Sequence, residues 1–205
     1  MTTGLIWVIV ALGLGCVLMR RRSVVVALVG VQSLCVAALA IALVPSRPSE
    51  FLPAALTLVL RAVVIVVLLV IAIRRTRHAL PGGEETVPFS RLVVAGAIIA
   101  ALVALIPAFG LESRLAERGA VALIATGLAL LVTRRATVMQ VVALLVAENG
   151  IAVAAVNVSG GLPVAVELGV AFDLVLVVTV AVVFHDRIFD MFGTTDTRIL
   201  RGLRD

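Results

Sequence analysis

Long apolar runs separated by short polar segments extend along almost the whole chain. A helix that crosses a bilayer needs about 20 mainly apolar residues, and polar or turn-forming residues mark where such a helix ends, as at Pro45–Ser49, Pro81–Glu85 and Ser159–Pro163. The qualifying runs are 4–19, 23–44, 51–73, 91–110, 115–133, 136–158 and 162–184. The pattern therefore predicts an all-α, polytopic membrane protein with about seven transmembrane helices.

Composition supports a chain that is solvated by lipid. Hydrophobic residues make up 62% of the sequence and charged residues only 14%, whereas a soluble domain has about 25% charged and about 45–50% apolar residues. The mean hydropathy is +1.25. The net charge of +5 comes mostly from arginines beside helix ends, so it does not indicate nucleic-acid binding.

The length of 205 residues suits one transmembrane helical domain that spans 1–205. Its parts are expected to be three helices in 1–80, a long loop and a fourth helix in 81–114, three further helices in 115–192 and a cytoplasmic tail in 193–205.

Arginine clusters predict the orientation of this domain, because loops rich in Lys and Arg stay in the cytoplasm. The clusters follow alternate predicted helices, at Arg20–Arg22, Arg74–Arg77, Arg134–Arg135 and in the C-terminal segment from Arg187 onward. The N-terminus is therefore expected outside, the C-terminus in the cytoplasm, and the number of spans odd. Since the first basic cluster follows the first apolar run, that run is expected to be a retained helix of a multi-pass plasma-membrane protein rather than a cleaved signal.

Three ionisable residues fall near the middle of predicted spans: Arg61 in the third, Glu148 in the sixth and Asp173 in the seventh. Each costs about 2.5–3.5 kcal/mol at the centre of a membrane helix. Such residues face the bundle interior, pair with one another, or meet water or another subunit. Two interpretations follow, a polar layer that conducts protons or ions and a static ion pair that locks the helices together.

The chemistry of these groups divides their roles. A buried carboxyl group near a guanidinium can both bind and release a proton, because burial favours its neutral form and the cation favours its charged form. Arginine stays protonated. Glu148 and Asp173 are therefore predicted to form a proton path with Arg61 as a fixed counter-charge, and the sequence leaves open which acid Arg61 contacts.

Other polar side chains in or beside the spans are predicted to support this path. Asn and Gln more often join helices by hydrogen bonds than line a path, and His185, at the predicted cytoplasmic end of the seventh helix, is also a common kind of interfacial residue. The supporting residues are Gln32, Gln140, Asn149, Glu167 and His185.

The two cysteines, Cys16 and Cys35, lie within apolar runs, and the sequence has no CxxC or Cys/His cluster. The chain is therefore expected to hold no iron–sulfur, zinc or nickel site, and its cysteines to act as packing residues. No catalytic, cofactor-binding or metal-binding residue is predicted.

The sixth predicted span carries the motif Glu148-Asn149-Gly150, preceded by Thr133-Arg134-Arg135 and Gln140. This segment resembles the Glu-Asn-Gly helix of the hydrogenase-4 component E (HyfE) family. The resemblance covers nearly the whole chain, and its further elements are Val31–Leu34, Val166–Asp173 and the tail segment Gly193–Leu203.

Helices five to seven also resemble the NuoK subunit of respiratory complex I and the MrpC subunits of cation/proton antiporters. The mid-span Glu of those proteins is matched by Glu148, the acid of their next helix by Asp173, and a residue near the end of that helix by His185. This chain has Asp at the second acidic position, and Arg61 where the relatives tend to have Lys. Because a buried Lys can release its proton and Arg does not, the third helix is not expected to carry protons here.

The resemblance implies a non-catalytic membrane subunit of a group 4 NiFe-hydrogenase, formate hydrogenlyase-like or complex I-like assembly. The implied partners are antiporter-like and quinone-subunit-like membrane proteins and a peripheral hydrogenase or redox arm. The NiFe centre and iron–sulfur clusters are expected in those partners. The alternatives are an MrpC-like subunit of a multisubunit cation/proton antiporter and a structural spacer of the membrane arm without conduction.

Overall fold

A computed structural model describes residues 2–43, 48–75, 88–106, 113–134, 137–157 and residue 179. Within these ranges the protein is built from helices, which confirms the all-α fold class and matches the first six predicted runs to within a few residues. The helices are α1 (Thr2–Leu18), α2 (Arg22–Leu43), α3 (Pro48–Arg75), α4 (Pro88–Leu105), α5 (Arg114–Thr133) and α6 (Thr137–Val156). The predicted seventh span, 162–184, and the tail, 193–205, lie outside the described residues.

Three of the described helices have the length and apolar character needed to cross a membrane: α2, α5 and the Val138–Val156 part of α6. Shorter apolar helices are formed by α1, by Ala55–Val67 within α3 and by Phe89–Leu105 within α4.

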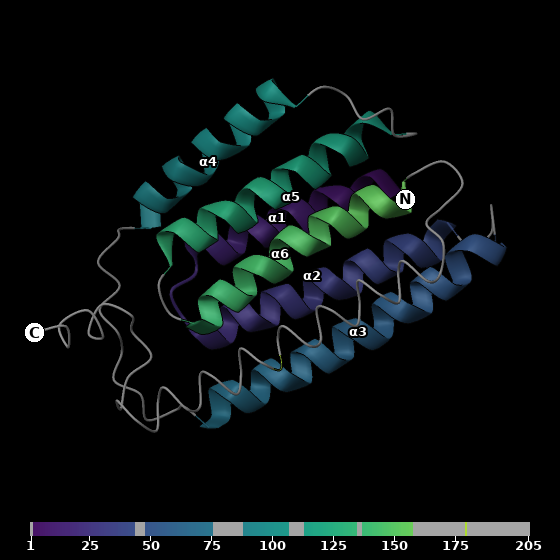
Figure 1. Ribbon diagram of the computed structural model, residues 1–205, viewed down its shortest axis with the longest axis horizontal. Coiled ribbons are helices and arrows are strands. Elements are labelled where there is room, and N and C mark those ends of the chain that lie inside the picture. The colour runs from purple at the N-terminus through teal and green to yellow at the C-terminus, as the bar shows by residue number, and fades with distance from the viewer. Residues whose placement is uncertain are drawn as a thin grey trace, which may run out of the picture.

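Four helices form the centre of the bundle, and Figure 1 shows them lying side by side along the long axis of the molecule. Contacts run from α1 to α2, from α2 to α6, from α6 to α5 and from α5 back to α1, so these helices close a ring. The outer helix α3 packs on α2 and reaches α6, while α4 packs on α5 and reaches α1. The core between them consists mostly of Val, Ile, Leu and Ala side chains. Within the bundle, α6 lies between α5, α2 and α3.

Glycines allow the backbones of α5 and α6 to approach closely. A Cβ atom added at Gly127 would lie 2.6 Å from the Ala143 carbonyl oxygen, and one added at Gly150 would lie 2.8 Å from the Ala120 carbonyl oxygen. Small residues at helix–helix contacts permit this kind of packing in apolar bundles. The α5–α6 contact therefore depends on two positions where no side chain larger than hydrogen fits without a shift.

Arg134 separates α5 from α6 and also caps a third helix. Its backbone leaves the helical region at φ −114° and ψ 129°, and its side chain is buried. The guanidinium Nη2 donates hydrogen bonds to the carbonyl oxygens of Val17, at 3.3 Å, and Met19. The last carbonyls of α1 have no partner within their helix and lie at the negative end of its dipole, so a buried cation stabilises this helix end.

We expect Gly127→Ala to destabilise the bundle and the matched change Gly96→Ala to be tolerated. The new methyl group at Gly127 would press on backbone atoms of α6, whereas a Cβ at the exposed Gly96 of α4 would meet nothing within 4 Å. Overpacking of this kind costs about 1–3 kcal/mol, and a compatible helical Gly→Ala change is neutral or stabilising. Thermal unfolding in detergent, followed by circular dichroism, measures both. Equal melting temperatures for the two variants would contradict the close α5–α6 contact.

Candidate functional site

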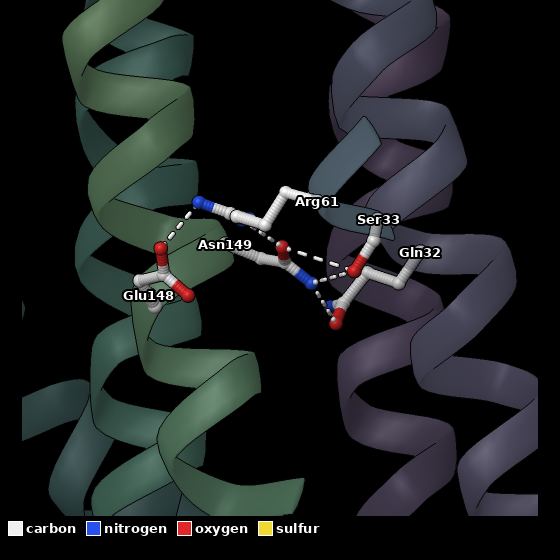
Figure 2. A network of polar contacts seen from close by, with 5 residues as sticks. All are labelled: Gln32, Ser33, Arg61, Glu148 and Asn149. Carbon is white, nitrogen blue, oxygen red and sulfur yellow. Dashed lines mark hydrogen bonds and ion pairs between the residues drawn. The ribbon is translucent and has the colours of Figure 1, made fainter. Parts of the chain in front are cut away.

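A cluster of polar side chains crosses the apolar bundle at mid-height. Gln32 and Ser33 lie at the middle of α2, Arg61 lies halfway along α3, and Glu148 and Asn149 lie just beyond the middle of α6. Figure 2 shows these side chains pointing toward one another between the helices. All are buried, and Gln32 and Asn149 are fully so, with 0% exposure.

The charged part of the cluster is an ion pair between α3 and α6. Arg61 Nη1 donates to Glu148 Oε1, and Arg61 Nη2 donates to Asn149 Oδ1 at 3.1 Å. Two oxygens from adjacent residues of α6 thus hold the planar guanidinium at two points. Of the two acids that the sequence offered as partners for Arg61, the structure pairs it with Glu148, while Asp173 lies outside the described residues.

The uncharged part of the cluster extends from α6 through α2 to α1. Asn149 Nδ2 donates to Gln32 Oε1 at 3.0 Å and to Ser33 Oγ at 3.1 Å. Gln32 Nε2 in turn donates to the Ile9 carbonyl oxygen at 2.9 Å. The whole network therefore connects α1, α2, α3 and α6 by hydrogen bonds, apart from their packing.

The three residues of the Glu-Asn-Gly motif face three different helices. Successive residues of an α-helix point about 100° apart, because 3.6 residues make one turn. Glu148 meets Arg61 of α3, Asn149 meets α2, and Gly150 allows the close approach of α5. The motif thus suits a helix with three neighbours. Glu148 reaches α3 by charge, Asn149 reaches α2 by its amide, and Gly150 lets the backbone of α5 come close.

Gly13 of α1 leaves room for the inner end of the network. A Cβ at this position would lie 2.9 Å from Gln32 Nε2 and 2.9 Å from Leu123 Cδ2. The bare face of α1 lets the Gln32 amide reach the Ile9 carbonyl. Sequence reasoning identified neither Gly13 nor Ser33 as a site residue, although Ser33 lies in the Val31–Leu34 segment that resembles the HyfE family.

The other predicted supporting residues do not join the network within the described part of the chain. Gln140 is exposed on α6, two turns before Glu148, and Glu167 and His185 lie outside the described residues. Two buried atoms of the ion pair, Arg61 Nε and Glu148 Oε2, have no hydrogen-bond partner among the described residues. The second carboxylate oxygen is therefore available for a further contact.

A metal site is not formed by the residues that the structure describes. No group of three or more His, Cys, Asp or Glu side chains there could hold an ion. Cys16 is a buried free thiol and Cys35 a half-buried one, and the Cys16 Sγ lies 3.9 Å from the Val25 carbonyl oxygen across the α1–α2 contact.

Comparison with known proteins adds a similarity of sequence. The chain is 34% identical over 119 residues to an uncharacterized protein of Mycobacterium tuberculosis, Rv0085. The alignment covers 57% of this chain and 54% of the relative, so the chain spans about half the length of the curated relative it matches. No protein-family model matches the chain, and no solved structure matches it.

We expect Arg61→Met and Glu148→Leu to be severely destabilising one at a time and much better tolerated together. Removal of one partner leaves a buried charge without compensation, which costs about 3–5 kcal/mol, whereas an apolar pair of similar volume is often neutral. Folded yield and melting temperature of the two single variants and the double variant, purified in detergent, give the coupling. Strictly additive losses would contradict a direct Arg61–Glu148 pair.

Proposed function

We propose that this protein is a multi-pass subunit of the plasma membrane. The three long apolar helices support this, and so does the outer surface of α3. Exposed apolar side chains form one stripe along that helix, spaced by three or four residues: Leu56, Leu60, Val63, Val67 and Ile71. Soluble proteins rarely expose apolar surface of this extent, whereas lipid would cover it without cost.

The topology that we propose has seven spans, with the N-terminus outside and the C-terminus in the cytoplasm. The contact of Arg134 with the Met19 carbonyl supports it. Because of this contact, the arginine-rich connections after α1 and after α5 share one end of the bundle. A charge excess at one end is the arrangement that the positive-inside rule requires.

Within the membrane, we propose that Glu148 and Asp173 belong to a path for protons and that Arg61 is its fixed counter-charge. The observation that carries this proposal is the buried Arg61–Glu148 pair at mid-height in an otherwise apolar bundle. An apolar pair would join the helices at least as well, so adhesion alone does not account for the charges. Ionisable groups at such depth ordinarily mark pathways for protons or ions.

The assembly that we propose is a group 4 NiFe-hydrogenase, formate hydrogenlyase-like or complex I-like complex, in which this chain is a non-catalytic subunit. The resemblance of Glu148-Asn149-Gly150 and the surrounding helices to the HyfE and NuoK families supports it. The partners would be antiporter-like and quinone-subunit-like membrane proteins and a peripheral hydrogenase arm. That arm would hold the NiFe centre and the iron–sulfur clusters.

A structural spacer is the second candidate function, and the shape of the network favours it. Hydrogen bonds from Gln32 and Asn149 tie α1, α2 and α6 together, as a static lock would. The two functions differ in what they require of Glu148, because a lock needs a hydrogen-bond acceptor there and a proton path needs a group that titrates.

We expect a fluorescent protein fused to the C-terminus to fold and fluoresce, and alkaline phosphatase fused there to stay inactive. Fluorescence of the fused protein reports a cytoplasmic C-terminus, whereas alkaline phosphatase becomes active only when it is exported. Truncation after Arg75, which ends α3, should give the same result, and truncation after Leu43, which ends α2, should give the opposite one. Matching signals after Leu43 and Arg75 would contradict the proposed topology.

We expect Glu148→Gln, whose amide oxygen can still accept from Arg61, and Asp173→Asn to lower proton translocation per assembled complex at least about tenfold, since an amide cannot exchange the proton. The complex is purified in mild detergent through a tag on this chain. Mass spectrometry of its subunits and measurement of nickel and iron identify the assembly. Dye-detected acidification of proteoliposomes, driven by a low-potential reductant, measures translocation. Glu117→Gln, a buried acid near the start of α5, is the matched control.

Assembly and pumping at the wild-type level in both variants would contradict conduction and favour the spacer. Co-purified antiporter subunits without nickel or iron–sulfur proteins would favour the MrpC-like alternative over a hydrogenase.

A further inference from the structure

We propose that Asn149 and Gln32 are positioning residues that hold the Arg61 guanidinium on Glu148. The inference rests on the proposed function only in giving Glu148 a proton-carrying role, because the positioning itself is a property of the network. The network couples the charge of Glu148 to the hydrogen bonds between α1, α2 and α6.

The order of donors and acceptors in the network is determined at its two ends. The Ile9 carbonyl can only accept and the Arg61 guanidinium can only donate. Gln32 must therefore turn its Nε2 toward α1 and its Oε1 toward α6. That oxygen requires a donor, so Asn149 turns its Nδ2 toward α2 and its Oδ1 toward Arg61. A flip of Gln32 would set like groups against each other at Ile9 and Asn149, and a flip of Asn149 would do so at Gln32 and Arg61, whereas the Ser33 hydroxyl bonds either end of the Asn149 amide.

This order places the Asn149 Oδ1 atom, rather than its Nδ2, where it accepts a second hydrogen bond from Arg61. Nη1 donates to Glu148 and Nη2 donates to Asn149 Oδ1, so the fork of the guanidinium is held against α6. Loss of the Asn149 oxygen would leave Nη2 buried without its acceptor, which is costly for a charged group. The guanidinium would then be held on α6 at one point only, at Glu148, and would be free to turn about that contact.

The charge of Glu148 responds to such a turn because Arg61 is the cation that faces it among the described residues. From α2, the polar groups facing this level are Gln32 and Ser33. The charged residues of α5 are all in its first two turns: Arg114, Glu117 and Arg118. When Arg61 is held less firmly, the neutral form of a buried carboxyl group gains, since less of the cost of burying its charge is offset.

Dicyclohexylcarbodiimide tests the inference, because this apolar reagent modifies protonated carboxyl groups in apolar surroundings. Membranes containing the full chain are treated at neutral pH, and mass spectrometry measures the modified fraction of Glu148. We expect Asn149→Leu to raise the labelling rate about tenfold, the ratio that corresponds to one hydrogen bond to a charged group. Gln32→Met should give a smaller increase, because Ser33 Oγ still accepts from Asn149 Nδ2.

The matched control is Asn157→Leu, which removes an amide just past the end of α6 that, among the described residues, donates to the Val153 carbonyl one turn earlier, at 2.8 Å. It should label like the wild type. Arg61→Gln should label most strongly, and Glu148→Gln identifies the site by losing the label. Labelling is compared at equal amounts of protein that elutes as a single peak after detergent extraction, so misfolded material does not contribute.

Wild-type labelling in both Asn149→Leu and Gln32→Met, with strong labelling in Arg61→Gln, would overturn the positioning role and leave the ion pair and the proposed function untouched. An equal rise in Asn157→Leu would also overturn it, since any loosening of α6 would then suffice. Conversely, failure of the proposed function appears as unchanged pumping in Glu148→Gln, which the labelling does not measure.

Discussion

A buried charge must find a partner inside an apolar bundle, and the arrangement of this protein depends on that constraint. Arg61 projects from α3 toward α6, and only the carboxylate of Glu148 compensates its charge among the described residues. The pair determines that α3 lies against the face of α6 that carries Glu148, because rotating either helix would bury two separate charges. The ion pair thereby holds α3, which packs mainly on α2, in register with α6 as well.

Buried amides also need partners, and this requirement connects α6 with α2 and α1. A buried amide needs a hydrogen-bond partner for both its oxygen and its nitrogen. The Asn149 oxygen accepts from Arg61, and its nitrogen donates to Gln32. The close α5–α6 contact at Gly127 then secures α5, which has no residue in the network, and the capping by Arg134 secures the end of α1, which contributes only the Ile9 carbonyl. Polar contacts determine which faces of α6 meet α2 and α3, and glycines determine how near α5 comes.

Hydropathy predicted the described helices well because each is a single apolar run with polar ends. The boundary between α5 and α6 has a weak sequence signal, since only Arg134 and Arg135 interrupt the apolar run, and Arg134 is a buried cap of α1 as well as a helix end. The candidate site was predicted in part: Arg61, Glu148, Gln32 and Asn149 are polar where apolar residues are expected. Ser33 and Gly13 gave no such signal, because Ser and Gly are ordinary residues in apolar helices.

The sequence by itself determined that the described part of the chain is helical and that Arg61 and Glu148 fall near the middle of their helices, because helix length and the cost of burying charge depend only on the order of residues along the chain. Tertiary structure alone decided which charges meet. The pairing of Arg61 with Glu148, and the path from Asn149 through Gln32 to the Ile9 carbonyl, depend on which helix faces which. Hydropathy is averaged around a helix and does not depend on which helices surround it. The neighbours of each helix are therefore seen only in the packed bundle.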